Sequence, residues 1–152
     1  MKAFRFRLET LLRLKDASRE RALQDYAVAI QMRQESETKL KNAVGYVEGL
    51  ENKLSEKRKV NFRASELSSI QMSLEQARQE VEGFTIEVSR QKALEESRRS
   101  IFLKKESESK SLLRLKERQM NEHLETETKK EEHELEDVIG ARYLYDRANP
   151  VV

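Results

Sequence analysis

Apolar side chains recur every three or four residues in two separate stretches of the chain. The first stretch contains Leu40, Ala43, Val47, Leu50 and Leu54. The second stretch contains Leu67, Ile70, Leu74, Ala77, Val81, Phe84 and Val88. Such spacing places each set along one side of an α-helix, as in the seam of a coiled coil. The pattern therefore predicts two amphipathic helices.

The two stripes mirror each other about residues 60–61. Leu54 and Leu67 lie about equally far from this point, as do Leu40 and Val81. A chain that folds back here brings each apolar position opposite another one. We therefore predict an all-α fold, namely a long antiparallel two-helix coiled-coil hairpin. The alternative is one continuous helix that dimerises through the same stripe.

The mirror point also predicts the boundaries of the elements. We expect residues 1–152 to form a single hairpin, with a helix over about 4–58, a turn over about 59–65, a helix over about 66–146 and a short tail over 147–152. Asn61 tolerates a left-handed backbone, and Ser65 can cap a helix that begins at Glu66. Residue 4 then lies opposite residue 117 or so, and the second helix continues beyond it as a C-terminal helical overhang.

The predicted seam becomes more polar away from the turn. In the first helix it runs through Arg33, Arg19 and Lys15, where charged side chains replace apolar ones. In the second helix the regular stripe ends at Val88. A shifted stripe then continues through Leu113, Glu117, Met120, Leu124, Leu135, Val138, Arg142 and Tyr145. We expect a helix with looser packing in this part of the chain.

Composition narrows the class of protein. Charged residues make up 38% of the chain, and its single proline is Pro150, so no obligatory helix breaker precedes the tail. The absence of cysteine excludes disulfides and a thiol nucleophile. No apolar run is long enough for a membrane span or the core of a signal peptide. We expect a cytoplasmic protein that does not insert into a membrane.

The chain offers no pattern of residues that predicts catalysis. His123 and His133 are ten positions apart, which does not match the i,i+4 spacing of a helical zinc pair. We expect both to be solvated. The four glycines form no phosphate-binding loop, and a two-helix structure has no pocket that would separate the pKa values of two carboxylates. We therefore expect no enzymatic activity, no metal and no cofactor.

Charge is distributed unevenly although the net charge is only +2. Residues 2–21 hold seven basic and three acidic side chains, and residues 98–118 hold eight basic and three acidic ones. The hairpin would place these segments side by side, whereas residues 121–137, with eight acidic and two basic side chains, are acidic. A basic-zipper nucleic-acid binder is disfavoured because Glu9, Asp16 and Glu20 interrupt the basic N-terminus.

Two parts of the chain resemble the FliJ family of flagellar type III export. The start, Phe4-x-Phe6-x-Leu8-Glu9-x-Leu11-Leu12-x-x-Lys15, is similar to the beginning of that family. Four further segments are similar to the C-terminal half of that family. They are Arg98-Arg99, the run LLRLKER over 112–118, Lys129-Lys130-Glu131-Glu132 and Leu135-Glu136-Asp137. The stalk proteins of virulence type III secretion systems are close neighbours of this family. A generic structural coiled-coil scaffold is the other alternative.

The resemblance implies a function that composition and periodicity do not. Members of the family are non-enzymatic two-helix stalks, similar to the coiled coil of the rotary ATP synthase gamma subunit. The end of the stalk with both termini is expected to enter the hexameric export ATPase and to promote its activity. Another part contacts the membrane export-gate protein, and export chaperones are further partners. The implied location is cytoplasmic, peripherally associated with the export apparatus at the inner membrane.

The resemblance and the hairpin together indicate candidate contact residues. For docking to the ATPase these are Phe4, Arg5, Phe6, Arg7, Leu8 and Arg142. For contact with the gate or a chaperone they are Tyr46, Ile70, Leu74 and Ala77. Each set has a structural alternative. The N-terminal residues can form a wide packing stripe against Leu112, Leu113 and Leu115, and the stripe from Ile70 to Ala77 can be buried in the seam.

Overall fold

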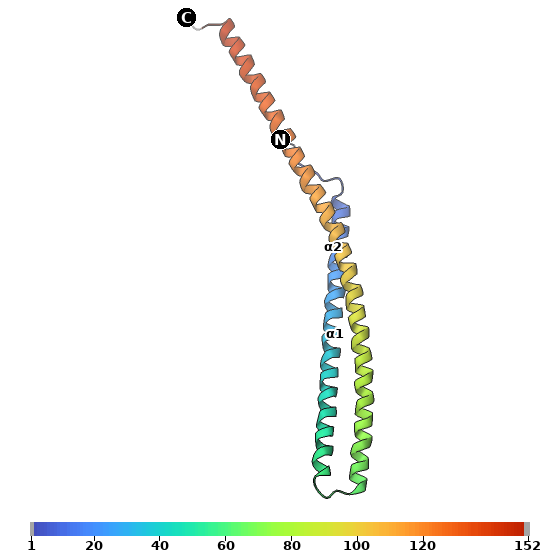
Figure 1. Cartoon of the computed structure of the whole chain (residues 1–152). Coiled ribbons are helices and arrows are strands. Elements are labelled where there is room, and N and C mark those ends of the chain that lie inside the picture. Colours follow the sequence, from blue (N-terminus) through green and yellow to red (C-terminus); the bar gives the residue numbers. More distant parts are fainter. Residues whose placement is uncertain (1, 151–152) are drawn as a thin grey trace. The chain divides into compact units, whose positions relative to one another are not determined.

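Two long helices make up most of the computed structural model, which describes residues 2–150 (Figure 1). Helix α1 spans Glu9–Arg58, 50 residues, and helix α2 spans Ala64–Ala148, 85 residues. Residues 59–63 connect them, and no strand occurs in the described part of the chain. The prediction of an all-α helical hairpin is confirmed.

The chain divides into two compact units. The central unit is Arg19–Lys104, and the terminal unit combines Met1–Ser18 with Lys105–Val152. The central unit holds the connection between α1 and α2, whereas the terminal unit joins the N-terminal part of the chain to the C-terminal part of α2. That both units form one domain stays a prediction.

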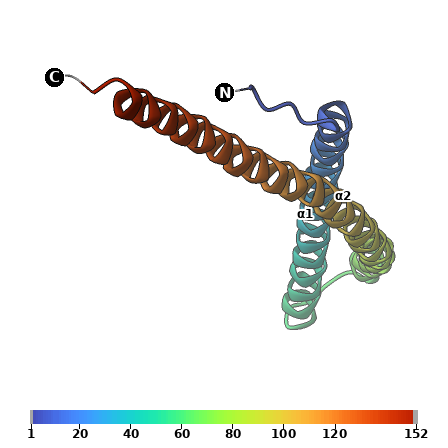
Figure 2. The same cartoon turned by 90° about the horizontal axis from the view of Figure 1, so that it is seen from above.

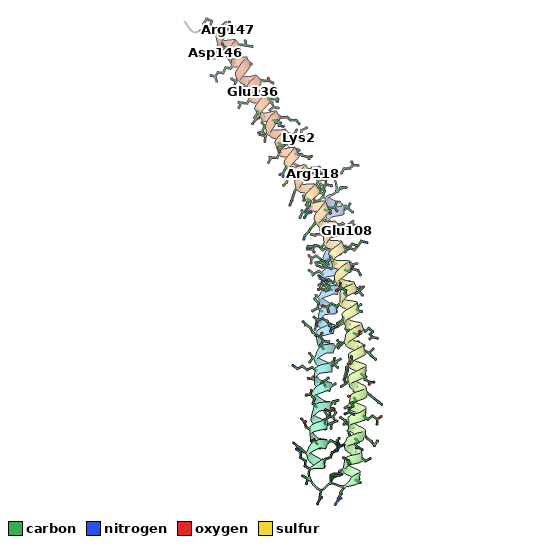
Figure 3. The ribbon with its side chains drawn as sticks, viewed as in Figure 1. Lys2, Glu108, Arg118, Glu136, Asp146 and Arg147 are labelled. Carbon is green, nitrogen blue, oxygen red and sulfur yellow. The ribbon has the colours of Figure 1, made fainter. Side chains whose placement is uncertain are left out.

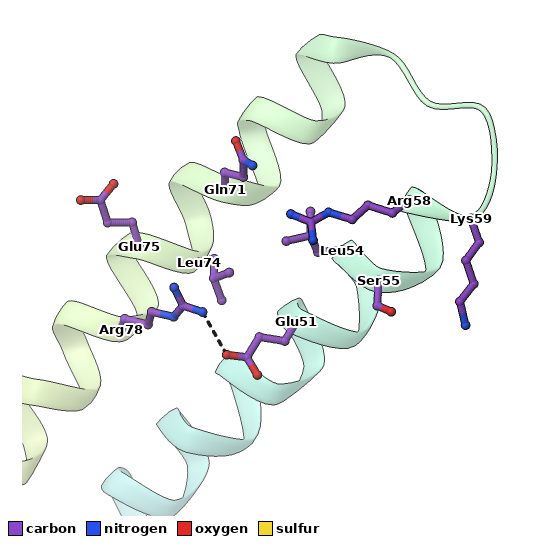
Figure 4. Close-up of a pocket in the computed structure, with 9 residues that line it drawn as sticks. All are labelled: Glu51, Leu54, Ser55, Arg58, Lys59, Gln71, Leu74, Glu75 and Arg78. Carbon is purple, nitrogen blue, oxygen red and sulfur yellow. Dashed lines mark hydrogen bonds and ion pairs between the residues drawn. The ribbon is translucent and has the colours of Figure 1, made fainter.

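Apolar residues of the predicted stripes form the core of the central unit. Leu54, Ile70 and Leu74 make a buried cluster. Packed against it are Val47, Leu50 and Leu67. Figure 4 shows Leu54 and Leu74 between the two helices near the turn. The same seam residues that the spacing predicts therefore hold the hairpin together.

The register of the two helices differs from the prediction. The mirror about residues 60–61 places Glu51 opposite residue 70, but its carboxylate pairs with Arg78 at 3.1 Å. Tyr26 likewise stacks on Phe102, with ring centroids 6.2 Å apart, instead of meeting residue 95. Side chains lean toward the N-terminus of their own helix, and in antiparallel helices the two leans add, but they account for only about two of these positions. The rest comes from how the two helices pack against each other. Residues that contact each other across the two helices therefore do not lie equally far from the turn, so counting residues from the turn does not identify the partners.

Polar residues occupy the seam of the central unit away from the turn, as predicted. Arg33 donates to Glu37 at 2.8 Å and also pairs with Glu95 on the other helix. The hydrogen bond to Glu37 is the main cause that raises the pKa of Arg33; burial opposes it, and Glu95 adds to it. Ser36 and Gln91 are buried in the same part of the seam. Polar and charged side chains therefore occupy part of the seam here.

Within residues 113–124 the expected shifted stripe of α2 does not form the buried face. Leu113, Met120 and Leu124 are 45%, 45% and 52% exposed. The original three-and-four spacing instead continues through polar residues. Its buried or half-buried members after Val88 include Gln91, Glu95, Phe102, Ser109, Leu112, Lys116, His123 and Glu127. Long polar side chains can pack their stems in a narrow seam and extend their polar ends to water, so the helix keeps its original face.

The boundaries of the helices depart from the prediction at three ends. Helix α1 begins at Glu9 rather than near residue 4, α2 begins at Ala64 rather than at Glu66, and α2 ends at Ala148. Ser65 therefore lies inside the first turn of α2 and not at its cap. Asn61 does not use a left-handed backbone, since no residue other than glycine among those described has a positive φ angle.

Two glycines in α1 have no structural requirement for glycine. A Cβ added to Gly45 or Gly49 would meet no atom within 4 Å, and neither residue has a positive φ angle. Glycine inside a helix is destabilising by roughly 0.5–1 kcal/mol relative to alanine. We predict that Gly45→Ala and Gly49→Ala each raise the free energy of unfolding by about that amount, measured by urea denaturation. A lower stability of either variant would show that the glycine has a packing role.

Candidate functional site

The N-terminal segment, residues 2–8, lies on α2 within the terminal unit. Its side chains alternate: Phe6 is only 8% exposed, Phe4 and Leu8 are half-buried, and Arg5 and Arg7 are exposed. Alternation with a period of two is typical of an extended chain. The segment therefore presents an apolar side to α2 and a basic side to solvent.

His123 of α2 fastens this segment. Its Nε2 lies 2.8 Å from the backbone carbonyl oxygen of Lys2. A carbonyl can only accept a hydrogen bond, so His123 Nε2 is the donor. The imidazole also contacts the ring of Phe4, with ring centroids 5.6 Å apart and planes tilted by 45°. One side chain thus holds the segment by both a hydrogen bond and a ring contact.

Glu127, one turn further along α2, adds an acidic contact. This residue is 8% exposed, and its carboxylate accepts a hydrogen bond from the backbone N–H of Lys2 and pairs with Lys130 at 3.6 Å. Burial opposes ionisation of Glu127. The charge of Lys130, the N–H of Lys2 and the nearby His123 outweigh burial and lower the pKa of the carboxyl group. The ionised carboxylate therefore stabilises the attachment of the segment.

Ion pairs continue the contact between the two parts of the terminal unit. Lys15 pairs with Glu108 at 2.9 Å, and Lys116 pairs with Glu9 at 2.9 Å. Before Glu9 the chain leaves the helix through a turn over residues 7–8, in which the N–H of Glu9 donates to the carbonyl oxygen of Phe6 at 3.2 Å. Phe4 meets His123, which lies further along α2 than the expected level of residue 117.

The structure brings five of the six ATPase-docking candidates together. These are the consecutive residues 4–8, of which Arg5 and Arg7 face solvent and Phe6 is buried. Arg142 is exposed on α2, about 28 Å along the helix from His123 at 1.5 Å per residue. Arg142 therefore does not join the cluster at Phe4. Of the leucines expected to pack against this segment, Leu112 and Leu115 are half-buried, and Leu113 is exposed.

The gate- or chaperone-contact candidates separate into two kinds. Ile70, Leu74 and Ala77 are 7%, 6% and 3% exposed and lie in the seam of the central unit, as the structural alternative predicts. Tyr46 is 58% exposed. A partner that meets the hairpin in this form can contact Tyr46 directly but not the buried three.

A second surface feature of the central unit is an open depression beside the turn (Figure 4). Glu51 and Arg78 bridge it, and Leu54 and Leu74 lie at its base. Among the described residues, no group of three or more His, Cys, Asp or Glu side chains is placed to hold a metal ion. The depression is therefore a groove between two helices with mixed polar and apolar walls.

The role of His123 differs from the prediction. Its expected solvation is wrong, because His123 is half-buried against Phe4, whereas the side chain of His133 is 81% exposed. The signal was available in the alternation of Phe4, Phe6 and Leu8 with arginines, which is typical of an extended segment rather than a helix. The apolar side chains of such a segment are buried only when the segment packs on another element, and this element is α2.

Comparison with known proteins agrees with this architecture. The family model described as flagellar FliJ protein matches residues 4–148. The structure of CT670 from Chlamydia trachomatis, a proposed YscO homolog, is similar with a TM-score of 0.55 and 17% sequence identity, covering 97% of this chain and 99% of that one. This likeness shows the fold alone. No curated protein sequence matches the chain. Over the described residues, neither helix has an apolar stretch that could cross a membrane.

The lowered pKa of Glu127 predicts a pH-dependent attachment of the N-terminal segment. A lowered pKa in the folded state gives stability that is present above the ordinary value of 4.5 and is lost as the pH falls through the lowered value. We expect Glu127→Gln to be less stable than the unaltered protein near neutral pH, and the difference to vanish on acidification. Urea unfolding over roughly pH 3 to 7 measures this. Glu125→Gln, an exposed neighbour, is the matched control, and a difference that persists in acid contradicts the assignment.

Proposed function

Because the chain belongs to the flagellar FliJ protein family, we propose that it is the non-enzymatic stalk of a flagellar type III protein export apparatus. In this proposal it inserts into the hexameric export ATPase, promotes ATP hydrolysis and couples the ATPase to the membrane export gate. Export chaperones are further partners. The protein acts in the cytoplasm, peripherally at the inner membrane.

The observation that carries the ATPase contact is the two-sided N-terminal segment. Phe6 and the ring of Phe4 fasten it to α2, so Arg5 and Arg7 are held outward on a supported backbone. Arginine is well suited to contacts with carboxylates and backbone carbonyls because its guanidinium group presents five donors in a fixed plane. The segment therefore offers a preorganised basic edge to an acidic partner surface.

The free part of α2 supports insertion into a narrow opening. Every described residue from 128 to 150 is exposed. Figures 1 and 2 show residues 128–148 as one helix along which no other described segment runs, and Figure 3 shows Glu136, Asp146 and Arg147 projecting from it. A single helix with its side chains is about 10–12 Å across. This width suits a channel at the centre of a ring of subunits.

A virulence type III secretion system is the second candidate setting. The observation that supports this second setting is the similarity in fold to a proposed YscO homolog. The two settings differ in the partner ATPase. Stimulation of a flagellar export ATPase but not of a virulence ATPase supports the flagellar assignment, and the reverse result supports the other. Stimulation of neither, with no binding, favours a structural scaffold.

Reversing the charge of the basic edge tests the ATPase contact. We predict that the double variant Arg5→Glu/Arg7→Glu loses the stimulation of the export ATPase, measured as the rate of ATP hydrolysis against the ratio of this protein to hexamer. Saturation near one copy per six subunits is expected for the unaltered protein. Both arginines are exposed, so the helical content and thermal midpoint remain unchanged.

The matched control reverses two exposed lysines of the central unit, Lys41→Glu/Lys53→Glu. It changes the net charge by the same amount on another part of the chain. We expect this control to stimulate normally. Equal loss in both variants would indicate a general charge effect, and full stimulation by the arginine variant would exclude the proposed edge.

A pair of substitutions separates contact from packing at the gate candidates. Tyr46→Ala removes an exposed ring, so we predict weaker binding to the export-gate protein with unchanged stability. Leu74→Ala removes a buried side chain of the seam and should lower the free energy of unfolding by about 2–4 kcal/mol. Calorimetric titration and urea denaturation measure the two effects. Unchanged gate binding by Tyr46→Ala would remove Tyr46 from the contact surface.

A further inference from the structure

The exposed part of α2 carries a regular stripe that nothing in the described chain covers. Leu135, Val138 and Tyr145 are 60%, 64% and 67% exposed. They recur at intervals of three and four residues together with polar positions on the same side of the helix. We call this set the overhang stripe: Thr128, Glu131, Leu135, Val138, Arg142 and Tyr145. Large apolar side chains gathered on one exposed face are typical of an interaction surface.

The overhang stripe has its own mirror symmetry. Leu135 and Val138 lie equally far from the midpoint between residues 136 and 137. Glu131 and Arg142 also lie equally far from it, as do Thr128 and Tyr145. When two copies of this helix run antiparallel, each position meets its mirror partner. Leucine then meets valine, and glutamate meets arginine, each twice because of the two-fold axis.

We propose that the overhang stripe is an interface for a second copy of this chain, which pairs antiparallel through residues 128–148. Two Leu135–Val138 contacts form the centre of the interface. Two Glu131–Arg142 ion pairs flank the centre and set the register. This inference does not depend on the proposed function, because it concerns the chain alone.

Charge selects the antiparallel arrangement. A parallel pair would place Glu131 against Glu131 and Arg142 against Arg142, and like charges in facing positions are destabilising. Glu131 also has an interaction within its own chain. Interactions between exposed polar groups contribute little to stability, so Glu131 can exchange this one for a contact with the second copy.

The length of the interface predicts a weak, concentration-dependent dimer. Residues 128–148 provide about three heptads, shorter than most independently stable two-stranded coiled coils. The helix already exists as the continuation of α2, so association does not have to pay for helix nucleation. In the dimer Arg142 is covered, so self-association would compete with any partner that uses this residue.

Sedimentation equilibrium of the full chain over a wide concentration range tests the proposal. We expect a reversible monomer–dimer equilibrium. Glu131→Arg or Arg142→Glu converts two attractive contacts into two repulsive ones and should weaken dimerisation at least about tenfold. An equimolar mixture of the two single variants restores opposite charges across the interface and should dimerise as the unaltered protein does. The double variant Glu131→Arg/Arg142→Glu should do the same.

The matched controls are charge reversals on the overhang but off the stripe, Glu136→Arg and Arg147→Glu (Figure 3). They should leave the dissociation constant unchanged. Circular dichroism should show equal helical content for all variants, because these residues are exposed. A monomer at every concentration overturns the proposal, as does a dimer that neither stripe reversal weakens. Such outcomes would leave the stripe to a different protein partner.

Cross-linking tests the direction of the pairing. The chain has no cysteine, so an introduced thiol is unique. A mixture of Leu135→Cys and Val138→Cys should oxidise mainly to the mixed disulfide, because the antiparallel register places these positions opposite each other. Predominant formation of the two homodisulfides would indicate a parallel pair and would contradict the proposed interface.

Discussion

A helix that packs against only one other helix can bury a single narrow stripe, and this constraint shapes both units of the protein. None of the described side chains reaches less than 2% exposure. The apolar cluster of Leu54, Ile70 and Leu74 is small and lies near the turn. Further along, the same stripe contains Arg33, Ser36 and Gln91. The composition of the seam changes because a thin seam leaves polar ends within reach of water.

Beyond the apolar cluster, pairs of polar and charged side chains form the contacts across the seam. Their contribution to stability is modest when they are exposed, but they distinguish one register from another because a charge must meet its opposite. Arg33 between Glu37 and Glu95 performs this role in the central unit, and Lys15 with Glu108 does so in the terminal unit. At the N-terminus, His123 and Glu127 replace helix packing with direct contacts to the backbone of Lys2. A segment held in this way presents its arginines without needing a core of its own.

The same constraint leaves much of the surface open to partners. Beyond Glu127 no described segment covers α2, so the apolar residues that follow remain exposed. The chain belongs to the flagellar FliJ protein family of type III export, and an exposed surface of this kind is suited to contact with a partner. A single helix can meet an enclosing ring, or a second copy of itself, with the same side chains.

Much of the fold could be predicted from the sequence because helical periodicity is a local property. The spacing of Leu40 to Leu54 and of Leu67 to Val88 determined the helices, their buried faces and the direction of the hairpin. The placement of Ile70 and Leu74 in the seam was one of two alternatives that the pattern left open. The candidate site could be predicted less well from the sequence. Phe4 to Leu8 were correctly expected near the end of the hairpin but were assigned to a helix, although their alternation indicates an extended chain.

Only the tertiary structure decided the register and the attachment of the N-terminal segment. Register depends on how the two helices pack, as the contacts of Glu51 with Arg78 and of Tyr26 with Phe102 show, and counting residues from the turn does not contain it. The role of His123 depends on a non-helical segment, residues 2–8, that folds onto α2 and brings Lys2 and Phe4 to it. By itself the sequence determined which residues face inward on each helix, since that follows from the repeat of a single chain. The pairing of residues across the seam was decided by the tertiary structure, because it depends on how two segments pack against each other.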